Sequence, residues 1–507
     1  MQNAEVANGQ PGVYVAVVAL RFQVPHTSRA AVRQAMVTAG YPAQRLRAAF
    51  ADTASDDLAA HGLTLQLRKH GGTWSQVLSR CVAGGSVIED VVVVPSPASG
   101  LPALDVHRHA GSRLWMSIPA TTHIAGSAMR VRLDLQVKRV CRTARSGASR
   151  IRITFDEGHL RCAEKQTAVC ELAFELLAGP QAGLVTVVSR WIERHGLWLG
   201  SCATFALTEV DAQGLGPLGA TRVSGNSLSS RLAPGDALPA MVGNCLEQLL
   251  PNAELVAAGI GSPVHLHQTR VALRRLRTAL RVFGPWSPSL DPRWDVVLRD
   301  VFQRLGTARD SDAVAAALTP QLAAAGAPLA QPPKAPGVES PAQILRHSTF
   351  NRVLTELIAF CDRKSDTLQG DHEPVAGRKL RPLSRAVLKR LHHQIIQDTP
   401  DFLTADDSAR HRTRKRLKRL RYSAEFLAPL FRDKAVARYL KSLRQALDTL
   451  GALNDLTIAD PLFRAQLAKD ARAWFAVGWI AARKAQCLQD CSTALDAFSR
   501  VRRFWET

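Results

Sequence analysis

The hydrophobic pattern of the chain changes near residue 200. Before that point, apolar and polar residues alternate in short β-branched runs, as in Arg130–Val137. Side chains alternate between the two faces of a strand, so this pattern predicts half-buried strands. The predicted strands lie at Val13–Leu20, Leu63–Leu67, Val91–Val94, Met129–Val137, Ile151–Phe155 and Leu172–Leu177. Helical spacing over Val185–His195 predicts a helix after the last of them.

Beyond the alternating region, the spacing of apolar residues is almost entirely helical from Leu238 onward, in long Leu/Ala/Arg segments. Residues 211–234 are rich in Gly, Ser and Pro and predict a linker. A Pro/Ala-rich stretch at about residues 319–341 predicts a flexible insertion within the helical part. We therefore expect an α+β protein with two domains, residues 13–210 and residues 235–507.

The charge balance of the chain indicates which class of partner it binds. The 507 residues include 65 Lys and Arg against 43 Asp and Glu, a formal net charge of +22. Residues 1–215 contain 22 basic and 16 acidic side chains, so +16 of the excess lies in the remainder of the chain. Such an excess predicts a polyanionic partner or an acidic surface and says nothing about the fold.

Composition also excludes several classes of protein. A hydrophobic share of 46% argues against wholesale disorder, and no apolar run approaches the roughly 18 residues of a membrane helix. The nine cysteines include no Cys-x-x-Cys pair, which predicts reduced thiols and no structural metal. We therefore expect a cytoplasmic protein that contacts no membrane and carries no cofactor.

One basic pattern, His-x2-Arg-x3-[Arg/Lys]-x2-Arg, occurs twice with an offset of 144 residues. Its members are His267, Arg270, Arg274 and Arg277 in the first copy and His411, Arg414, Lys418 and Arg421 in the second. Steps of three, four and three residues place each set on one face of a helix, here called a basic stripe. Separate packing positions are provided by Leu273, Leu276, Leu280, Leu417, Leu420 and Leu427. The repetition predicts a duplicated helical unit.

Neither stripe contains an acid, within residues 267–281 or 408–424. Like charges at neighbouring helix positions cost about 0.2–0.5 kcal/mol per pair, so a bound anion explains the pattern better than a merely solvated face. The candidate anion ligands are His267, Arg270, Arg274, Arg277, Arg281, His411, Arg414, Lys415, Lys418 and Arg421. Arg275 and Arg419 are further candidates at the rim. For the two histidines, a buried, hydrogen-bonded role is the alternative.

Each stripe is followed by a Leu-Gly corner that carries an acid. The corners are Leu305-Gly306 with Arg309, Asp310 and Asp312, and Leu450-Gly451 with Asn454 and Asp455. The stripes and corners resemble the CHAD family, the conserved-histidine α-helical domain, over about residues 235–505. This resemblance implies two four-helix bundles with pseudo-twofold symmetry, whose basic helices line a channel that binds inorganic polyphosphate.

The N-terminal part resembles a second family, the CYTH or triphosphate tunnel domain, over about residues 13–205. The segments that carry the resemblance are Phe50-Ala-Asp52-Thr53, Leu58–Arg68, Asp156-Glu-Gly158 and Glu171–Gly179. The resemblance implies an antiparallel β-barrel whose tunnel holds a triphosphate and a divalent metal.

The tunnel motifs are degenerate in this chain. The Glu-x-Glu-x-Lys motif of catalytic members reads Val17-x-Ala19-x-Arg21, and the Thr-Leu-Lys strand reads Val77-Leu78-Ser79. Ala173 replaces the middle acid of a late strand. The resemblance implies that a vestigial tunnel remains, formed by Arg21, Arg68, Asp156, Glu171 and Glu175. Because Mg²⁺ and Mn²⁺ need oxygen ligands, we expect no bound metal and no catalytic residue.

The leading hypothesis is therefore a polyphosphate-binding protein that uses the two basic stripes. One alternative is a metal-dependent triphosphatase that acts through the barrel. Another is weak, nonspecific binding of nucleic acid, against which the aromatic content of 6% argues, since Tyr422 is the one aromatic residue in the stripes. Chain-length preference, oligomeric state, phosphate affinity of the barrel and association with polyphosphate granules stay open.

Overall fold

The computed structural model describes residues 15–37, 42–81, 86–116, 124, 127–162, 165–200, 219–223, 225, 228–307, 318–328, 339–362 and 379–506. The chain divides into two compact units. The first comprises Met1–Thr221, Leu250–Leu266 and Leu345–Asp362, and the second Arg222–Leu249, His267–Ile344 and Arg363–Thr507. The predicted domain boundaries, linker and insertion stay predictions, because parts of those stretches lie outside the described residues.

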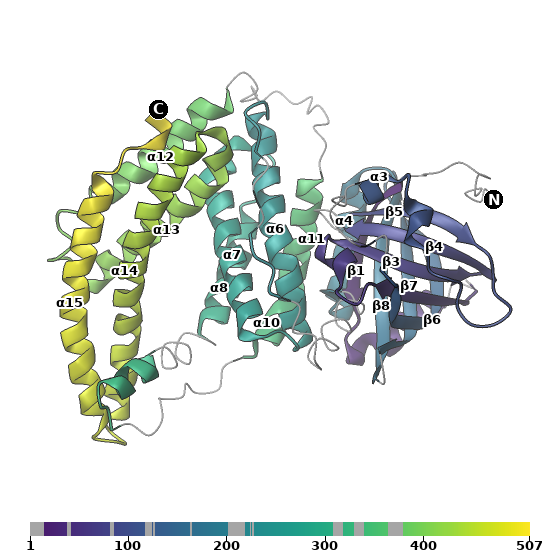
Figure 1. Ribbon diagram of the computed structural model, residues 1–507, viewed down its shortest axis with the longest axis horizontal. Coiled ribbons are helices and arrows are strands. Elements are labelled where there is room, and N and C mark those ends of the chain that lie inside the picture. The colour runs from purple at the N-terminus through teal and green to yellow at the C-terminus, as the bar shows by residue number, and fades with distance from the viewer. Residues whose placement is uncertain are drawn as a thin grey trace. The chain divides into compact units, whose positions relative to one another are not determined.

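A nine-stranded antiparallel sheet makes up most of the first unit (Figure 1). Its strands are β1 (Val15–Gln23), β2 (Gln44–Asp52), β3 (Leu63–His70), β4 (Thr73–Cys81), β5 (Ser86–Val94), β6 (Arg130–Ser146), β7 (Ser149–Cys162), β8 (Lys165–Ala178) and β9 (Trp198–Leu199). They are ordered β5-β4-β3-β2-β6-β7-β8-β1-β9. Val15–Val18 of β1 also pair with β5.

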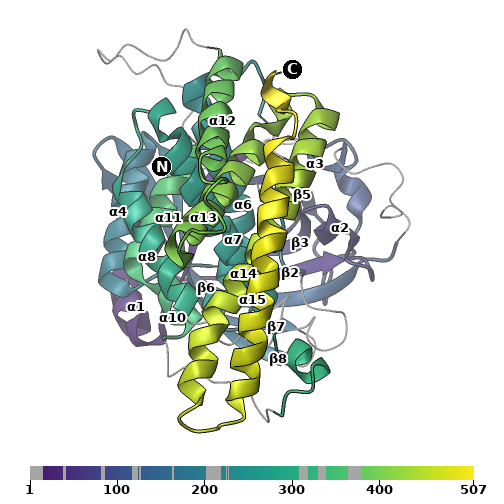
Figure 2. The same cartoon turned by 90° about the vertical axis from the view of Figure 1, so that its left-hand side faces the viewer.

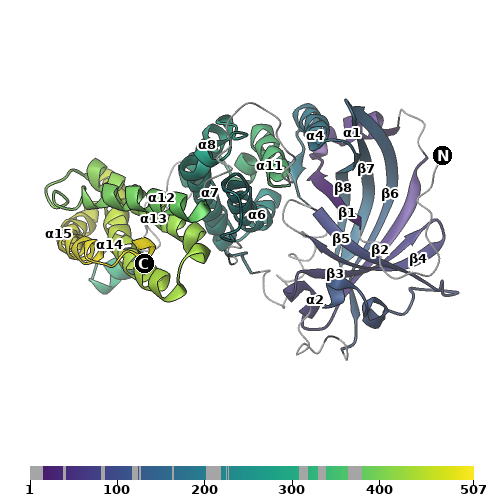
Figure 3. The same ribbon diagram turned by 90° about the horizontal axis from the view of Figure 1, so that it is seen from above.

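The helices of the first unit pack beside the sheet. They are α1 (Arg29–Val37), α2 (Asp57–Ala60), α3 (Arg113–Met116), α4 (Gln181–His195) and α11 (Ser348–Cys361). α4 ends at His195, and the next residue, Gly196, has a positive φ of 64° and donates its amide to the Ile192 carbonyl. α4 lies beside α11 (Figure 3), and the Leu199 amide donates to Asn351 Oδ1 at 2.9 Å. The predicted helix over Val185–His195 is confirmed.

The second part of the chain is helical, as the spacing from Leu238 onward predicts. Its helices are α6 (Pro234–Ala258), α7 (Pro263–Phe283), α8 (Arg293–Thr307), α10 (Pro341–Arg346), α12 (Leu380–Ile396), α13 (Asp407–Leu427), α14 (Asp433–Gln466) and α15 (Ala473–Ser499). Consecutive members of the α12–α15 set contact one another, and α14 and α15 form a long hairpin (Figure 2). The protein is thus α+β, with a β-sheet part followed by a helical part.

The leucine positions predicted from helical spacing lie in the core. Side chains with an exposure of 3% or less include Leu273, Leu276, Leu280, Leu417, Leu420 and Leu427. A separate aromatic cluster surrounds His392, whose Nδ1 lies 2.9 Å from the Tyr439 hydroxyl. Burial, and then the charge of Arg503, lower the pKa of His392 to about 4. His392 is therefore a neutral core residue near pH 7.

The second predicted Leu-Gly corner is wrong, because Leu450 and Gly451 lie inside the continuous helix α14. A glycine within a helix costs about 1 kcal/mol relative to alanine, and burial of Leu450, Leu453 and Leu456 outweighs that cost. Leu305 and Gly306 lie at the end of α8, whereas Arg309, Asp310 and Asp312 fall outside the described residues. No described helix is both long and apolar enough to cross a membrane.

Candidate anion-binding site

The two basic stripes lie on α7 and α13, whose ends are set by local sequence. α7 starts at Pro263, a residue that suits the first helical position because the N–H that it lacks would have no partner there. Asp406 caps α13 by accepting a hydrogen bond from the Ala409 amide at 2.6 Å. Each helix buries its leucines, so the basic residues occupy its other faces.

Two aromatic rings and one buried arginine join α7 to α13. Phe283 and Phe426 meet edge to face, with ring centroids 6.2 Å apart. The Arg275 guanidinium lies 5.0 Å from the Phe426 ring centroid. It donates to Asn244 Oδ1 at 2.8 Å and to Gln248 Oε1 at 3.0 Å, both on α6. The two repeated helices therefore pack directly on each other.

Lys418 of α13 lies among cations from both stripes. Burial, followed by the charges of Arg274 and Arg414, lowers the pKa of Lys418 to about 6, and Arg270 adds to the effect. Asp455 acts in the opposite direction but does not restore the usual value. Because Arg270 and Arg274 belong to α7, both copies of the repeat contribute to one group. We call Arg270, Arg274, Arg414 and Lys418 the cationic cluster.

The ring of Phe302 on α8 supports the α7 side of this cluster. The guanidinium carbons of Arg274, Arg270 and Arg277 lie 5.0, 5.4 and 6.0 Å from its centroid. Arg270 is 8% exposed and donates from Nη1 to the Leu305 carbonyl at 2.7 Å, which fixes its position. Phe302 does not belong to either stripe, so a pattern read along one helix does not reveal it.

The expectation that the first stripe has no balancing acid is wrong. Asp295, near the start of α8, accepts from Arg277 Nε through Oδ1 and from Arg281 Nε through Oδ2, both at 2.9 Å. Burial lowers the pKa of Arg277 although this ion pair opposes the shift. The acid is absent from the helical pattern because a neighbouring helix supplies it. Arg277 and Arg281 are thus partly neutralised, whereas Arg274 has no side-chain hydrogen bond or ion pair within the described ranges.

The second stripe has partners of its own. Arg421 Nε donates to Glu425 Oε1 at 2.8 Å, one helical turn further along α13. His411 Nδ1 lies 3.1 Å from Asn454 Oδ1 of α14. Burial, and then the charge of Lys415, lower the pKa of His411, which keeps the ring neutral near pH 7. The structure places Lys415 in an exposed position.

The residues predicted to line a vestigial tunnel in the first unit occur as ion pairs. Arg21 Nη1 donates to Glu171 Oε1 at 3.0 Å, and Gln23 Nε2 donates to Glu171 Oε2 at 3.1 Å. Arg139, which the sequence analysis did not single out, holds Asp156 through two hydrogen bonds of 2.7 Å. Strand register places Arg139, Asp156, Glu171 and Gln23 in one row across β6, β7, β8 and β1. The two carboxylates of this row are balanced by two guanidiniums.

The other residues of this predicted set form ion pairs as well. Arg68 pairs with Glu89 at 3.0 Å, and Arg152 pairs with Glu175 at 2.8 Å. Ala173 lies opposite Arg21 in the β1–β8 register. Among the residues that the structure describes, no three His, Cys, Asp or Glu side chains gather as a metal site would require.

The model of the CHAD domain matches residues 240–464, which include both stripes and the cationic cluster. Residues 240–464 form a CHAD domain. A crystal structure of the CHAD domain from the plant Ricinus communis is 28% identical, covers 57% of this chain and 98% of its own, and gives a TM-score of 0.44.

Two further structures are similar to about a third of the chain. A putative adenylate cyclase from Bacillus halodurans is 13% identical, covers 36% of this chain and 90% of its own, and gives a TM-score of 0.26. A putative adenylyl cyclase from Hippeastrum with a dominant triphosphatase activity is 13% identical, covers 36% and 89%, and gives a TM-score of 0.25. No curated protein shows significant similarity to the chain.

Two arginines of the CHAD domain, which we expected at the rim of the anion site, are buried or half-buried. Arg275 is 2% exposed and forms part of the interface between α6, α7 and α13, so the expectation for this residue is wrong. Arg419 occupies the equivalent position of the second stripe and is half-buried. Burial, followed by the charges of Arg281 and Arg416, lowers the pKa of Arg419. The two residues are alike in sequence position but not in environment.

Proposed function

We propose that the CHAD domain binds inorganic polyphosphate through the cationic cluster. The observation that carries the proposal is Lys418, whose pKa falls to about 6 through burial and through Arg274, Arg414 and Arg270. Three arginines beside a partly buried lysine that is neutral near pH 7 favour an anion, because the anion both relieves the repulsion between the arginines and returns a proton to the lysine.

The arrangement suits an extended phosphate chain better than a single ion. The first stripe together with Arg281 extends about 21 Å along a helix at 1.5 Å per residue. The second stripe contributes Arg414 and Lys418 to the same cluster. Guanidiniums donate two parallel hydrogen bonds to phosphate oxygens, so a row of them matches a linear polymer of phosphates.

Nucleic acid fits this cluster less well. Proteins that bind single strands without sequence preference stack bases on aromatic side chains. The aromatic ring that adjoins the cluster, Phe302, is already contacted by the guanidiniums of Arg270, Arg274 and Arg277. The cluster therefore offers charge and hydrogen-bond donors for phosphates and no open stacking platform among the described residues.

The test is a calorimetric titration of the full chain with long-chain polyphosphate. The double variant Arg274→Gln with Lys418→Gln should bind at least about 100-fold more weakly, since each charge-assisted contact contributes about 1.5–3 kcal/mol. The control, Lys441→Gln with Arg444→Gln, replaces the same two residue types at exposed positions on α14 and should change affinity less than about threefold.

Equal losses of polyphosphate affinity in the two double variants would mean that net charge alone drives binding and would overturn the proposed site. A competition with single-stranded DNA separates the remaining alternative. Polyphosphate should displace DNA from the wild-type chain at lower phosphate concentration than DNA displaces polyphosphate. The reverse order would favour nucleic acid as the partner.

A further inference from the structure

Lys418 differs from the arginines around it because a lysine amine can lose its proton and act as a nucleophile, whereas a guanidinium stays charged. The residue is half-buried on α13. Its side chain forms no hydrogen bond or ion pair with any residue that the structure describes. Asp455 of α14 favours the charged form but makes no ion pair with the amine. A half-buried ammonium without a carboxylate partner is unfavourable, so the local geometry favours the neutral amine.

The arginines beside this amine also oppose its protonation, and those of α7 are held in place by contacts of their own. Arg270 is 8% exposed, and the guanidinium carbon of Arg274 lies 5.0 Å from the centroid of the Phe302 ring. Burial, followed by the charges of Arg274 and Arg414, lowers the pKa of Lys418 to about 6, in agreement with this geometry. Most Lys418 amines are therefore neutral at pH 7.5, against about one in a thousand for an ordinary exposed lysine.

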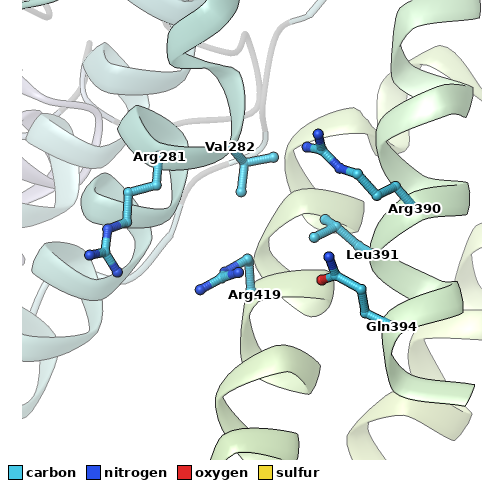
Figure 4. Close-up of a pocket in the computed structure, with 6 residues that line it drawn as sticks. All are labelled: Arg281, Val282, Arg390, Leu391, Gln394 and Arg419. Carbon is cyan, nitrogen blue, oxygen red and sulfur yellow. The ribbon is translucent and has the colours of Figure 1, made fainter. Parts of the chain in front are cut away.

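A second basic hollow of the same domain contains no such amine. It is a cavity of about 400 Å³ between the end of α7, the middle of α12 and the middle of α13 (Figure 4). Its described lining residues are Arg281, Val282, Arg390, Leu391, Gln394 and Arg419. Three of them are arginines and none is a lysine, so this hollow offers charge without a nucleophile. Of the two basic places, the cationic cluster is the one suited to a covalent reaction.

The charges around Lys418 determine which electrophile suits the amine. An acyl donor would leave a neutral amide and an aldehyde a neutral or cationic imine, so neither product would be stabilised by the neighbouring guanidiniums. Carbon dioxide instead converts an amine into an anion, requires no leaving group and is small enough to reach a half-buried atom. Arg274 has no side-chain hydrogen bond or ion pair within the described ranges, so its donors are available to that anion.

We propose that Lys418 is a site of reversible carbamylation by carbon dioxide. The lone pair of Nζ attacks the carbon atom, a new N–C bond forms, and the electron pair of one C=O π bond moves to oxygen. The amine nitrogen then releases one proton to water. The product is a carbamate with one negative charge, to whose oxygens Arg274 and Arg414 donate. No electron is transferred, so the reaction requires no oxidant and reverses when carbon dioxide is removed.

The carbamate and polyphosphate should exclude each other, a consequence that rests on the polyphosphate proposal. Bound polyphosphate protonates Lys418 and thereby removes the nucleophile. The carbamate in turn occupies the guanidinium donors that the phosphates need. Carbon dioxide should therefore weaken the binding of polyphosphate, and polyphosphate should suppress the carbamate by the same factor.

The modification is tested on the full chain without polyphosphate, at pH 7.5 in buffer equilibrated with 13C-labelled carbon dioxide. We expect a carbamate carbon signal by NMR that exceeds the background of Lys418→Met. Conversion of the carbamate to its ethyl ester with a trialkyloxonium salt, followed by mass spectrometry of the wild-type peptides, should place it on Lys418. The matched control Lys441→Met, at an exposed position on α14, should keep the signal.

Arg274→Gln keeps the amine and removes one donor to the carbamate. This variant should lower the apparent affinity for carbon dioxide at least about tenfold, because one charge-assisted contact is lost. The wild-type mapping and this variant keep the test decisive even if Lys418→Met fails to fold. Absence of an adduct on Lys418, or an adduct that is unchanged in Arg274→Gln, overturns the proposal.

Calorimetry with polyphosphate separates a failure of this proposal from a failure of the polyphosphate site. Carbon dioxide should weaken polyphosphate binding at least about fivefold relative to gas-free buffer of equal pH and ionic strength. Lys418→Met should show no such difference, which excludes competition by bicarbonate. An adduct that leaves polyphosphate affinity unchanged supports the carbamate and overturns the polyphosphate site. Polyphosphate binding that depends on Arg274 and Lys418 without any adduct supports that site and overturns the carbamate.

Discussion

The two repeated helices of the CHAD domain share a pattern of basic residues but put one equivalent arginine to different uses. Arg275 of α7 is 2% exposed and held by Asn244 and Gln248, whereas Arg419 of α13 lines a hollow with Arg390. The helix itself does not explain the difference. The preceding helix does, since Asn244 and Gln248 of α6 accept from Arg275, whereas no side chain of α12 that the structure describes accepts from Arg419. The two repeated helices thus keep the same spacing of basic residues. The neighbouring helix determines whether an arginine at a given position is buried in the core or lines a cavity.

The largest expected effect of this contrast is on stability. Arg275→Leu removes two hydrogen bonds to buried amides and the contact with Phe426, so it should lower the free energy of unfolding by about 2–4 kcal/mol. Arg419→Leu removes a repelling charge and should change it by no more than about 0.5 kcal/mol. Urea unfolding followed by circular dichroism measures both. Equal losses would show that the two arginines have the same structural role.

An intermediate effect is expected on the pH dependence of stability. With a pKa of about 6, Lys418 is neutral in the folded protein from above pH 6 up to the ordinary lysine range, while the unfolded chain holds the proton. Unfolding therefore takes up a proton in this window, and the free energy of unfolding should rise as the pH increases from 6 to 9. Lys418→Met should reduce that rise, and Lys415→Met, at an exposed neighbour, should not. An unchanged slope in Lys418→Met would contradict a neutral lysine in the cluster.

The smallest effect concerns the acids beside the two stripes. Asp295 bridges Arg277 and Arg281 from another helix, whereas Glu425 pairs with Arg421 within α13. Asp295→Asn should cost about 1 kcal/mol because it leaves a mostly buried Arg277 without its partner, and Glu425→Gln should cost about 0.3–0.5 kcal/mol. Thermal unfolding at low salt measures both losses of stability. A larger loss for Glu425→Gln than for Asp295→Asn would contradict this prediction.

Much of this architecture follows from the sequence because periodicity reports on one element at a time. The alternation over Arg130–Val137 predicts a strand that the structure contains within β6, and the spacing of Leu273 and Leu417 predicts buried positions on α7 and α13. Charge along a helix likewise identifies both stripes. These features depend on the local chain alone.

What the sequence did not reveal depends on contacts between elements. Asp295 and Phe302 lie on α8 and meet the first stripe only through packing. Arg275 has the same spacing as exposed arginines, and only its burial beside α6 distinguishes it. Gly451 follows a leucine as a turn glycine would, yet long-range packing keeps α14 continuous through it. Tertiary contacts override local preference at each of these places.

The row of paired charges across β6, β7, β8 and β1 opposes the binding of a cation by the carboxylates of the first unit. A divalent ion would have to displace Arg21 from Glu171 and Arg139 from Asp156, whose carboxyl side chain is 7% exposed. Removing either arginine first leaves a buried carboxylate without a counter-charge, which costs several kcal/mol. New carboxylates on β1 alone would therefore add repulsion instead of a ligand set. Replacement of one partner at a time therefore passes through a less stable protein, whereas simultaneous replacement of both partners avoids the unpaired carboxylate.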